Sequence, residues 1–191
     1  TTSMKFSQQG RIIQMQDKNG NFLKFDYDKD SIREISDNNG RKLGFKYYNN
    51  KKVKTISGPS GVTVEYKYHS NLDDLASVKN AWGNTYTYDY GDLHNLTKAT
   101  WPDKTSITLN YDKKKDWVTS YTDRDKCVET YGYEFSEKDR RHHYWSTVKK
   151  MCGKEITNQS RHEFWFKDSA NGDTYLQRVS SVVNGANRYH H

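Results

Sequence analysis

Residues 83–90 read GNTYTYDY, and this stretch decides the fold. Tyr86, Tyr88 and Tyr90 occupy every second position, and threonine or aspartate stands between them. Because successive side chains of a β-strand point to opposite faces, this alternation predicts a strand with one aromatic, half-buried face. A helix would place its apolar residues about 3.6 positions apart, and the stretch has no such spacing.

The same pattern recurs about every 21 residues, counted from an anchor residue that closes a turn. The anchors are Gly20, Gly40, Gly61 and Gly83, and the spacing places the next two at Lys104 and Lys126. Three, five and seven residues after each anchor stand apolar or aromatic residues, with Glu129 as the one exception. These positions hold Leu23, Phe25, Tyr27, Leu43, Phe45, Tyr47, Val64, Tyr66, Tyr68, Tyr86, Tyr88, Tyr90, Ile107, Leu109, Tyr111, Tyr131 and Tyr133.

The anchor glycines close short polar segments that reverse the chain. Residues 17–20 read DKNG, residues 37–40 read DNNG and residues 58–61 read GPSG. An aspartate that opens such a turn caps it with its side chain, and the closing glycine adopts a positive φ. The sequence therefore predicts about seven consecutive antiparallel hairpins, or about fourteen strands.

A second set of apolar residues stands eight and five positions before each anchor. The pairs are Ile12/Met15, Ile32/Ile35, Val53/Ile56, Leu75/Val78, Leu96/Ala99, Val118/Tyr121 and, before Gly153, Trp145/Val148. Residues three apart cannot share a face of a regular strand, because the side-chain period is two. We therefore expect a β-bulge between the members of each pair, which brings both inward.

We expect one array over residues 1–191, with clear repeats at 10–135 and degenerate repeats at 136–189. In the degenerate part, Phe164 and Phe166 are candidates for the inward pair of a seventh hairpin, and Leu176 and Val179 for the start of an eighth. We interpret residues 190–191, both histidine, as a tag remnant and the chain as a piece of a longer protein. A strip of this many strands is expected to curve, since open twisted sheets of more than about ten strands curl.

The composition agrees with a sheet whose buried face is tiled with amphipathic rings. Only 32% of the residues are apolar, whereas 15 are tyrosine. The net charge of +7 comes from lysines interleaved with aspartates, which indicates a solvated face rather than the basic stripe of a nucleic-acid site. The sequence has no apolar run of the length that crosses a membrane.

The strands end in a recurring aromatic motif. Residues 25–28 read FDYD, 66–68 read YKY, 86–89 read YTYD and 109–112 read LNYD. The series resembles the YD repeat, also called the RHS repeat, over nearly the whole chain. The resemblance implies a long ribbon of antiparallel hairpins that spirals into a hollow shell.

The resemblance also implies a class of function. In bacterial polymorphic toxins and insecticidal toxin complexes such a shell encloses a toxic C-terminal segment, and in teneurins a similar shell serves cell-surface recognition. Bacterial members often end in a self-cleaving aspartyl site with a Pro…Asp-Pro-x-Gly motif. This sequence has only Pro59 and Pro102 and lacks the motif, so no cleavage site transfers.

The sequence predicts no enzyme, cofactor or metal site. His142 and His143 follow two arginines, which repel a cation, and His162 and Glu163 lack a third ligand at a recognised spacing. Carboxylate pairs such as residues 73–74 stand in turns, where aspartate caps the backbone. No nucleophile motif, phosphate loop or dinucleotide fingerprint is present.

Cys127 and Cys152 are the two cysteines, and the pairing register decides whether they meet. If a long turn joins a strand ending at Phe135 to one beginning at Tyr144, counting inward places Cys127 opposite Cys152. A non-hydrogen-bonded pair about 4.5 Å apart would allow a disulfide, which requires an oxidising compartment. A register shift of one residue would instead send the sulfurs to opposite faces. The alternative to the bond is a pair of buried free thiols.

The leading hypothesis is a structural shell segment of a large secreted or cell-surface bacterial protein, whose partner is the cargo or the remaining repeats of the same polypeptide. The alternative is a carbohydrate-binding, adhesive module, because exposed aromatic rows can stack on sugar faces. Open sheet edges predict self-association, through Ile12–Met15 or the stretch Val179–Val183. A loop or tail that covers each edge would prevent it.

Overall fold

The protein is all-β. The structure is a computed structural model that describes residues 2–70 and 73–190, and of residues 187–190 only the backbone. Its regular elements are seventeen strands and two short 3-10 turns, Pro59–Gly61 and Asp92–His94. In this described part no helix is long and apolar enough to cross a membrane. His191, half of the expected tag remnant, lies outside the described residues.

The chain divides into two compact units, Thr1–Tyr88 and Asp89–His191. The first unit contains the short strands β1 (Ser3–Phe6), β2 (Ile12–Gln16), β3 (Phe22–Asp28), β4 (Ser31–Asp37), β5 (Lys42–Tyr47), β6 (Val53–Ser57), β7 (Thr63–Tyr68) and β8 (Leu75–Lys79). Strand β9 (Thr85–Tyr90) runs across the boundary.

The second unit begins with short strands, and its longest strands come before a short last one. Its strands are β10 (Leu96–Thr100), β11 (Ser106–Tyr111), β12 (Val118–Thr122), β13 (Val128–Phe135), β14 (His143–Cys152), β15 (Glu155–Asp168), β16 (Thr174–Val183) and β17 (Ala186–His190). The long strands β14, β15 and β16 lie in the part of the chain where the sequence pattern is degenerate.

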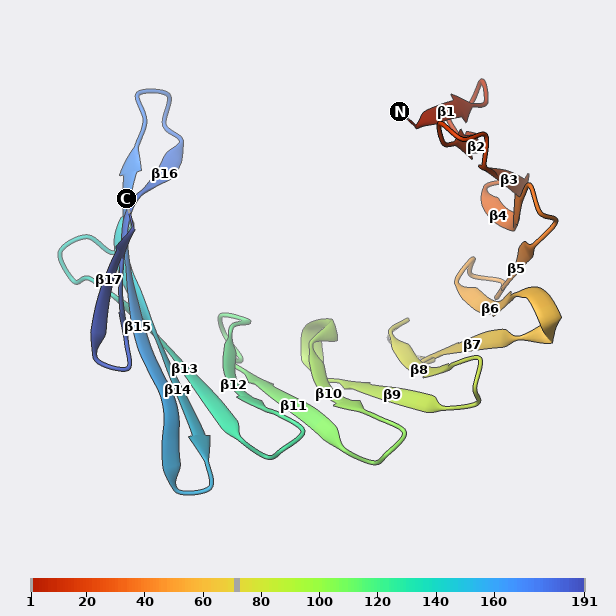
Figure 1. Ribbon diagram of the computed structural model, residues 1–191. Helices are drawn as coiled ribbons and strands as arrows, with labels where there is room; N and C mark the ends of the chain where they lie inside the picture. The colour runs from red at the N-terminus through yellow and green to blue at the C-terminus, as the bar shows by residue number, and fades with distance from the viewer. Residues whose placement is uncertain (1, 71–72, 191) are drawn as a thin grey trace. The chain divides into compact units, whose positions relative to one another are not determined.

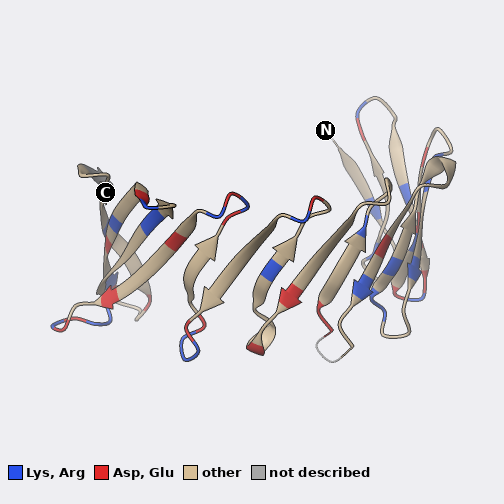
Figure 2. Cartoon of the chain, turned by 90° about the horizontal axis from the view of Figure 1, so that it is seen from below, with Lys and Arg blue, Asp and Glu red and all other residues tan. Residues whose placement is uncertain are grey.

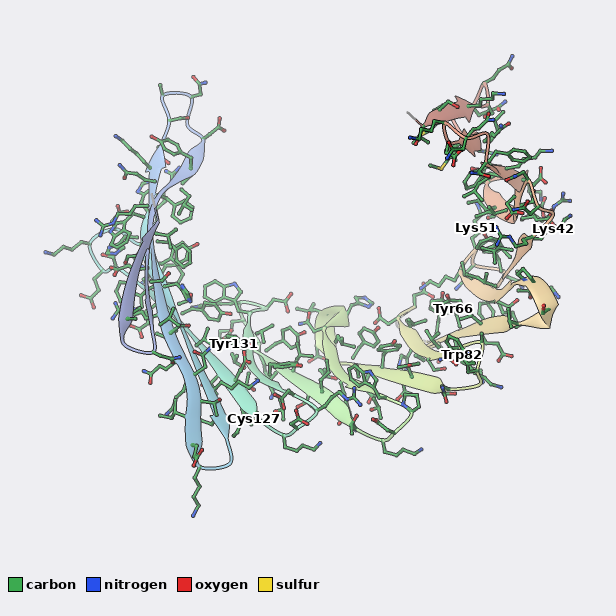
Figure 3. The ribbon with its side chains drawn as sticks, in the orientation of Figure 1. Lys42, Lys51, Tyr66, Trp82, Cys127 and Tyr131 are labelled. Carbon is green, nitrogen blue, oxygen red and sulfur yellow. A yellow bond between two sulfur atoms is a disulfide. The ribbon has the colours of Figure 1, made fainter. Side chains whose placement is uncertain are left out.

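Each strand pairs antiparallel with the next one, from β1 to β9 and again from β10 to β17. The predicted fold class, a series of consecutive hairpins, is therefore confirmed. Within the first unit, successive hairpins turn in one direction, so the strip from β1 to β8 follows an arc (Figure 1). Tyr66 lies on the inner side of this arc and Lys42 on the outer side (Figure 3).

Register shifts fall where the apolar pairs predict them. Asp26 faces Glu34 and Tyr27 faces Ile32, so Arg33 is the extra residue of a bulge that turns Ile32 and Ile35 to the same face. The extra residues at the corresponding positions are Ile13, Lys54, Ala76, Thr119 and, in the degenerate part, Gln177.

The prediction for Trp145 and Val148 is wrong. Trp145 faces Glu134 and Val148 faces Tyr131 in a ladder without a register shift, so the two residues lie on opposite faces of β14. The next ladder, between β14 and β15, does have a register shift, and its extra residue is Thr157 in β15.

The buried side of the sheet is a single layer of side chains. Ala99, which is 6% exposed, is the only apolar side chain classed as buried in the described part of the chain, and no large side chain there is fully enclosed. The aromatic residues that follow the anchors are half-buried on one face, except for Tyr133, which is 38% exposed. We call this the inner face, and the opposite one the outer face.

The predicted sites of self-association are misplaced. Ile12–Met15 belongs to β2, which has a partner on both sides, and Val179–Val183 belongs to β16, which also has two. The strands at the two ends of the series, β1 and β17, each have one neighbour among the described strands. The residues before Ile12 and after Val183 form these two additional strands, which the sequence pattern did not predict.

Candidate functional site

The inner face is held together by tyrosines seven residues after the anchors. The Tyr27 hydroxyl donates a hydrogen bond to the carbonyl oxygen of Ile12, at 2.9 Å, across the open end of its hairpin. The same bond joins Tyr47 to Ile32 at 2.7 Å, Tyr111 to Leu96 at 2.9 Å and Tyr133 to Val118 at 3.1 Å. We call this bond the tyrosine staple. It gives a half-buried hydroxyl a partner, which a buried polar group requires.

Burial of these rings also perturbs their ionisation. Removal from water disfavours the charged phenolate, and burial raises the pKa of Tyr47, Tyr68 and Tyr111. Tyr68 has no staple among the hydrogen bonds of the described residues and instead meets Tyr48 edge to face, with ring centroids 6.0 Å apart. The inner face therefore behaves as a partly desolvated aromatic surface.

The turns that shape this face repeat one backbone conformation. The four anchor glycines have φ between 76° and 86°, in the left-handed region that favours glycine. Lys104 and Lys126 have φ of 71° and 68°, so the lysine anchors adopt the same conformation at a steric cost.

A carboxylate three residues before the anchor caps several of these turns. Asp37 accepts hydrogen bonds from the backbone amides of Asn39 and Arg41, at 2.9 Å each, and Asp123 does the same for Asp125 and Cys127. Such bonds favour the charged carboxylate. The pKa of Asp123 is lowered, first by the Lys150 ammonium and also by these amides.

Glu129, the one exception to the apolar pattern, belongs to a polar cluster on the inner face. It faces Lys150 across β13 and β14 and accepts a hydrogen bond from the Tyr131 hydroxyl at 2.9 Å. The Lys150 ammonium lies 3.5 Å from Glu129 and 2.9 Å from Asp123. Every charged member of the cluster therefore has a partner, and none is left as a free nucleophile or base.

Tyr131 has the largest shift in this cluster. Burial and the hydrogen bond to Glu129 raise the pKa of Tyr131 to about 12. Lys150 shows the complementary effect, since the carboxylate of Asp123 raises the pKa of its ammonium. Both pKa shifts arise in groups that already have hydrogen-bonding or ionic partners within the protein, as groups with a structural role do.

The disulfide lies beside this cluster. Cys127, directly before β13, and Cys152, the last residue of β14, are joined with Cα atoms 4.3 Å apart. The register runs from Phe135 opposite Tyr144 to Val128 opposite Met151, as counting inward from the long turn predicts. Tyr131 and Cys127 lie along the same strand, with Cys127 nearer to the turn at its start (Figure 3).

The histidines make structural contacts. His142 bridges Asp139 and Asp168 at 3.0 and 3.1 Å, and His162 contacts the hydroxyls of Ser160 and Ser181 at 3.1 and 2.7 Å. Across the described residues, no three histidine, cysteine or acidic side chains gather as a metal site would require. Basic and acidic residues stand side by side in many of the turns (Figure 2).

The sequence pattern missed a second aromatic surface. On the outer face of β14 and β15, His143 stacks on Trp165 with ring centroids 5.0 Å apart and meets Trp145 at 5.6 Å. The signal is present in residues 164–166, which read FWF. Three consecutive aromatics in a strand must place a ring on each face.

Comparisons with known proteins agree with this geometry. Residues 1–162 match the family described as Teneurin YD-shell. The fold matches the crystal structure of TcdB2-TccC3-Cdc42, with a TM-score of 0.54, 12% identity, and coverage of 92% of this chain and 10% of that one. It also matches the Tc holotoxin pore of Photorhabdus luminescens, with a TM-score of 0.50, 12% identity, and coverage of 99% of this chain and 9% of that one.

These likenesses have a defined scope. At 12% identity the solved structures show that the fold is shared, and the chain spans about a tenth of the length of the structures that it matches. None of the curated proteins compared matches the chain.

Proposed function

The chain belongs to the Teneurin YD-shell family, and from this membership we propose that it is a non-catalytic wall segment of a large secreted or cell-surface bacterial protein, whose shell encloses a toxin or other cargo. Its partners are then the remaining repeats and the cargo of the same polypeptide. A family and a fold made of shell repeats indicate a structural role rather than a catalytic one.

The observation that carries the proposal is the difference between the two faces. The inner face is aromatic, and its recurring hydroxyls are used in staples inside the sheet. Charged residues such as Lys42, which pairs with Glu34 at 2.9 Å, lie on the outer face of the same strands. A wall that separates an enclosed volume from solvent needs this asymmetry.

The same observation weighs against the carbohydrate-binding alternative. A sugar site needs exposed ring faces with free polar groups around them, whereas the stapled tyrosines are half-buried and their hydroxyls are occupied. The comparisons also favour the shell segment.

Thiol accessibility in the parent polypeptide tests the proposal. The single disulfide leaves no free cysteine among the described residues, so an introduced cysteine can be labelled selectively. Leu43→Cys places a thiol on the inner face, where Leu43 is 41% exposed in this chain, and Lys42→Cys places one on the outer face one residue away.

Enclosure predicts that a bulky maleimide labels both variants of the isolated chain, but only the Lys42→Cys variant of the parent polypeptide. Equal labelling of the two positions in the parent polypeptide would contradict enclosure. The labelling of the isolated chain serves as the control for folding and thiol reactivity.

A further inference from the structure

The outer face of the second unit carries a continuous row of aromatic and basic side chains. The Arg161 guanidinium lies 4.8 Å from the Trp145 ring centroid, and the Arg178 guanidinium lies 4.5 Å from that of Trp165. His143 lies between the two indoles, 5.6 Å from Trp145 and 5.0 Å from Trp165. The row thus runs from one cation through three rings in contact, of which His143 and Trp165 are stacked, to a second cation.

The two arginines at the ends of the row are open. Both residues are exposed, and neither guanidinium contacts a carboxylate or another acceptor among the described side chains of residues 2–70 and 73–186. Each is held over an indole, which restricts its side chain before any partner arrives.

Other arginines of this chain show what such a group binds. Arg124 lies over Trp101 at 4.9 Å, and its guanidinium bonds the Asp103 carboxylate and the Thr105 hydroxyl. Arg11 lies over Tyr27 at 5.7 Å and bonds the Asp30 carboxylate. In both cases the ring positions the guanidinium and a carboxylate occupies its donors, in the geometry that arginine favours.

The acidic side chains within the row are already used. Glu163 lies on β15 between Arg161 and Trp165 and contacts the His143 imidazole at 2.6 Å. Glu134 accepts a hydrogen bond from the Trp145 indole nitrogen at 2.8 Å. Neither carboxylate neutralises the arginines. The negative charge of Glu163 would repel a further carboxylate of a bound partner at the middle of the row.

We propose that Arg161 and Arg178 form a two-point docking site for an extended acidic polypeptide segment with two carboxylates four residues apart and uncharged residues between them. Arg178 faces Trp165, which is four residues from Arg161 on the same strand. At about 3.3 Å per residue the backbone positions of the two arginines are about 13 Å apart along the strand direction. An extended peptide spaces residues i and i+4 by the same distance.

Fluorescence anisotropy with labelled peptides tests this site on the whole chain. The probe is a peptide with two glutamates separated by three glycine or serine residues, and the reference probe replaces both glutamates with glutamine. We expect the glutamate peptide alone to bind, and Arg161→Gln or Arg178→Gln to weaken binding by about tenfold, the loss of one charge-assisted contact.

Arg124→Gln is the matched control, because Arg124 is stacked on Trp101 in the same way but is already paired. It should leave the affinity unchanged, and circular dichroism of all variants checks that the sheet persists. The site would be overturned if the glutamine peptide bound. It would also be overturned if the Arg161→Gln and Arg178→Gln variants bound the glutamate peptide as tightly as the natural chain does. Tighter, arginine-dependent binding of a heparin oligosaccharide would overturn the peptide as its occupant in favour of a general polyanion.

Discussion

At the scale of the residue, each stapled tyrosine contributes a buried ring and a satisfied hydroxyl from one side chain. The ring covers apolar neighbours on the inner face, and the hydroxyl closes the open end of its hairpin. A phenylalanine would supply only the first contribution, and it would leave a carbonyl without its donor. The recurrence of tyrosine at this position follows from that difference.

Tyr27→Phe measures the staple directly. The substitution removes the hydrogen bond to the Ile12 carbonyl, and we expect the free energy of unfolding to fall by about 0.5–1.5 kcal/mol, the usual net contribution of one such bond. Urea denaturation followed by circular dichroism provides the value.

Tyr66→Phe is the control for that experiment. Tyr66 lies on the same inner face, and its hydroxyl makes no hydrogen bond within the part of the chain that the structure describes. Its removal should change the stability little. An equal loss in the two variants would show that the staple contributes nothing specific.

The raised pKa of Tyr131 predicts that the folded chain loses stability at high pH. The folded chain holds the proton of this phenol more tightly, with a pKa of about 12 against an ordinary value of 10.0. The resulting stabilisation is complete below pH 10 and declines as the pH rises from 10 towards 12, because the folded state binds more protons across that interval.

Denaturation at a series of pH values tests this prediction. In the Tyr131→Phe variant the decline between pH 10 and 12 should be smaller, because the phenol is absent. In a near-ultraviolet titration, the tyrosinate absorbance of the variant should also lack the component that appears at the highest pH. If the variant and the natural chain show the same decline and titration, the Tyr131–Glu129 contact does not control this ionisation.

At the scale of the element, the disulfide fixes the first of the long hairpins. Between Phe135 and Val128 the pairing of β13 with β14 has no bulge, so the hairpin lacks the register marker of the shorter repeats. A covalent bond between Cys127 and Cys152 pins that register, and a slip of one residue becomes impossible.

Removal of the bond should destabilise the second unit. The loop spans a sequence separation of 25, so Cys127→Ser with Cys152→Ser should lower the free energy of unfolding by about 3 kcal/mol on the chain-entropy estimate. Tryptophan fluorescence in urea measures the loss, since Trp101, Trp117, Trp145 and Trp165 belong to this unit.

Reductant should reproduce the loss in the natural chain and have no effect on the double variant. A natural chain that is indifferent to reductant would contradict the prediction. So would two reactive thiols after denaturation without reductant.

The elements also show what a single sequence can and cannot predict. Strand alternation and the apolar pairs locate the hairpins and the bulge at Arg33, because both depend on residues close together in the chain. The face of Trp145 depends instead on the absence of a bulge in β14, which no local spacing records. The register that places Cys127 opposite Cys152 also places Glu129 opposite Lys150, but the sequence alone does not show that the Tyr131 hydroxyl completes the cluster.

At the scale of the whole molecule, the sheet has one layer and few enclosed side chains, so each hairpin depends on its neighbours. The strand β1 has a described neighbour on one side only, and its apolar side chains Met4 and Phe6 are 52% and 57% exposed. An unpaired strand edge with apolar side chains is a template for association with another chain.

We expect the chain to self-associate through β1 as its concentration rises. Met4→Lys with Phe6→Lys should shift sedimentation velocity profiles towards the monomer, because charge on an edge strand opposes pairing. Leu176→Lys is the control, since Leu176 is 49% exposed but belongs to β16, which has a partner on both sides. A natural chain that stays monomeric at every concentration would contradict this expectation.

The tyrosine staple has a consequence for how such a chain changes over generations. Donor and acceptor are fifteen residues apart and belong to the same repeat, as in Tyr27 with Ile12 and Tyr47 with Ile32. A recombination event that duplicates or deletes one repeat of about 21 residues therefore moves both partners together. The array can grow or shrink by whole repeats, and no tyrosine hydroxyl or strand carbonyl loses its partner.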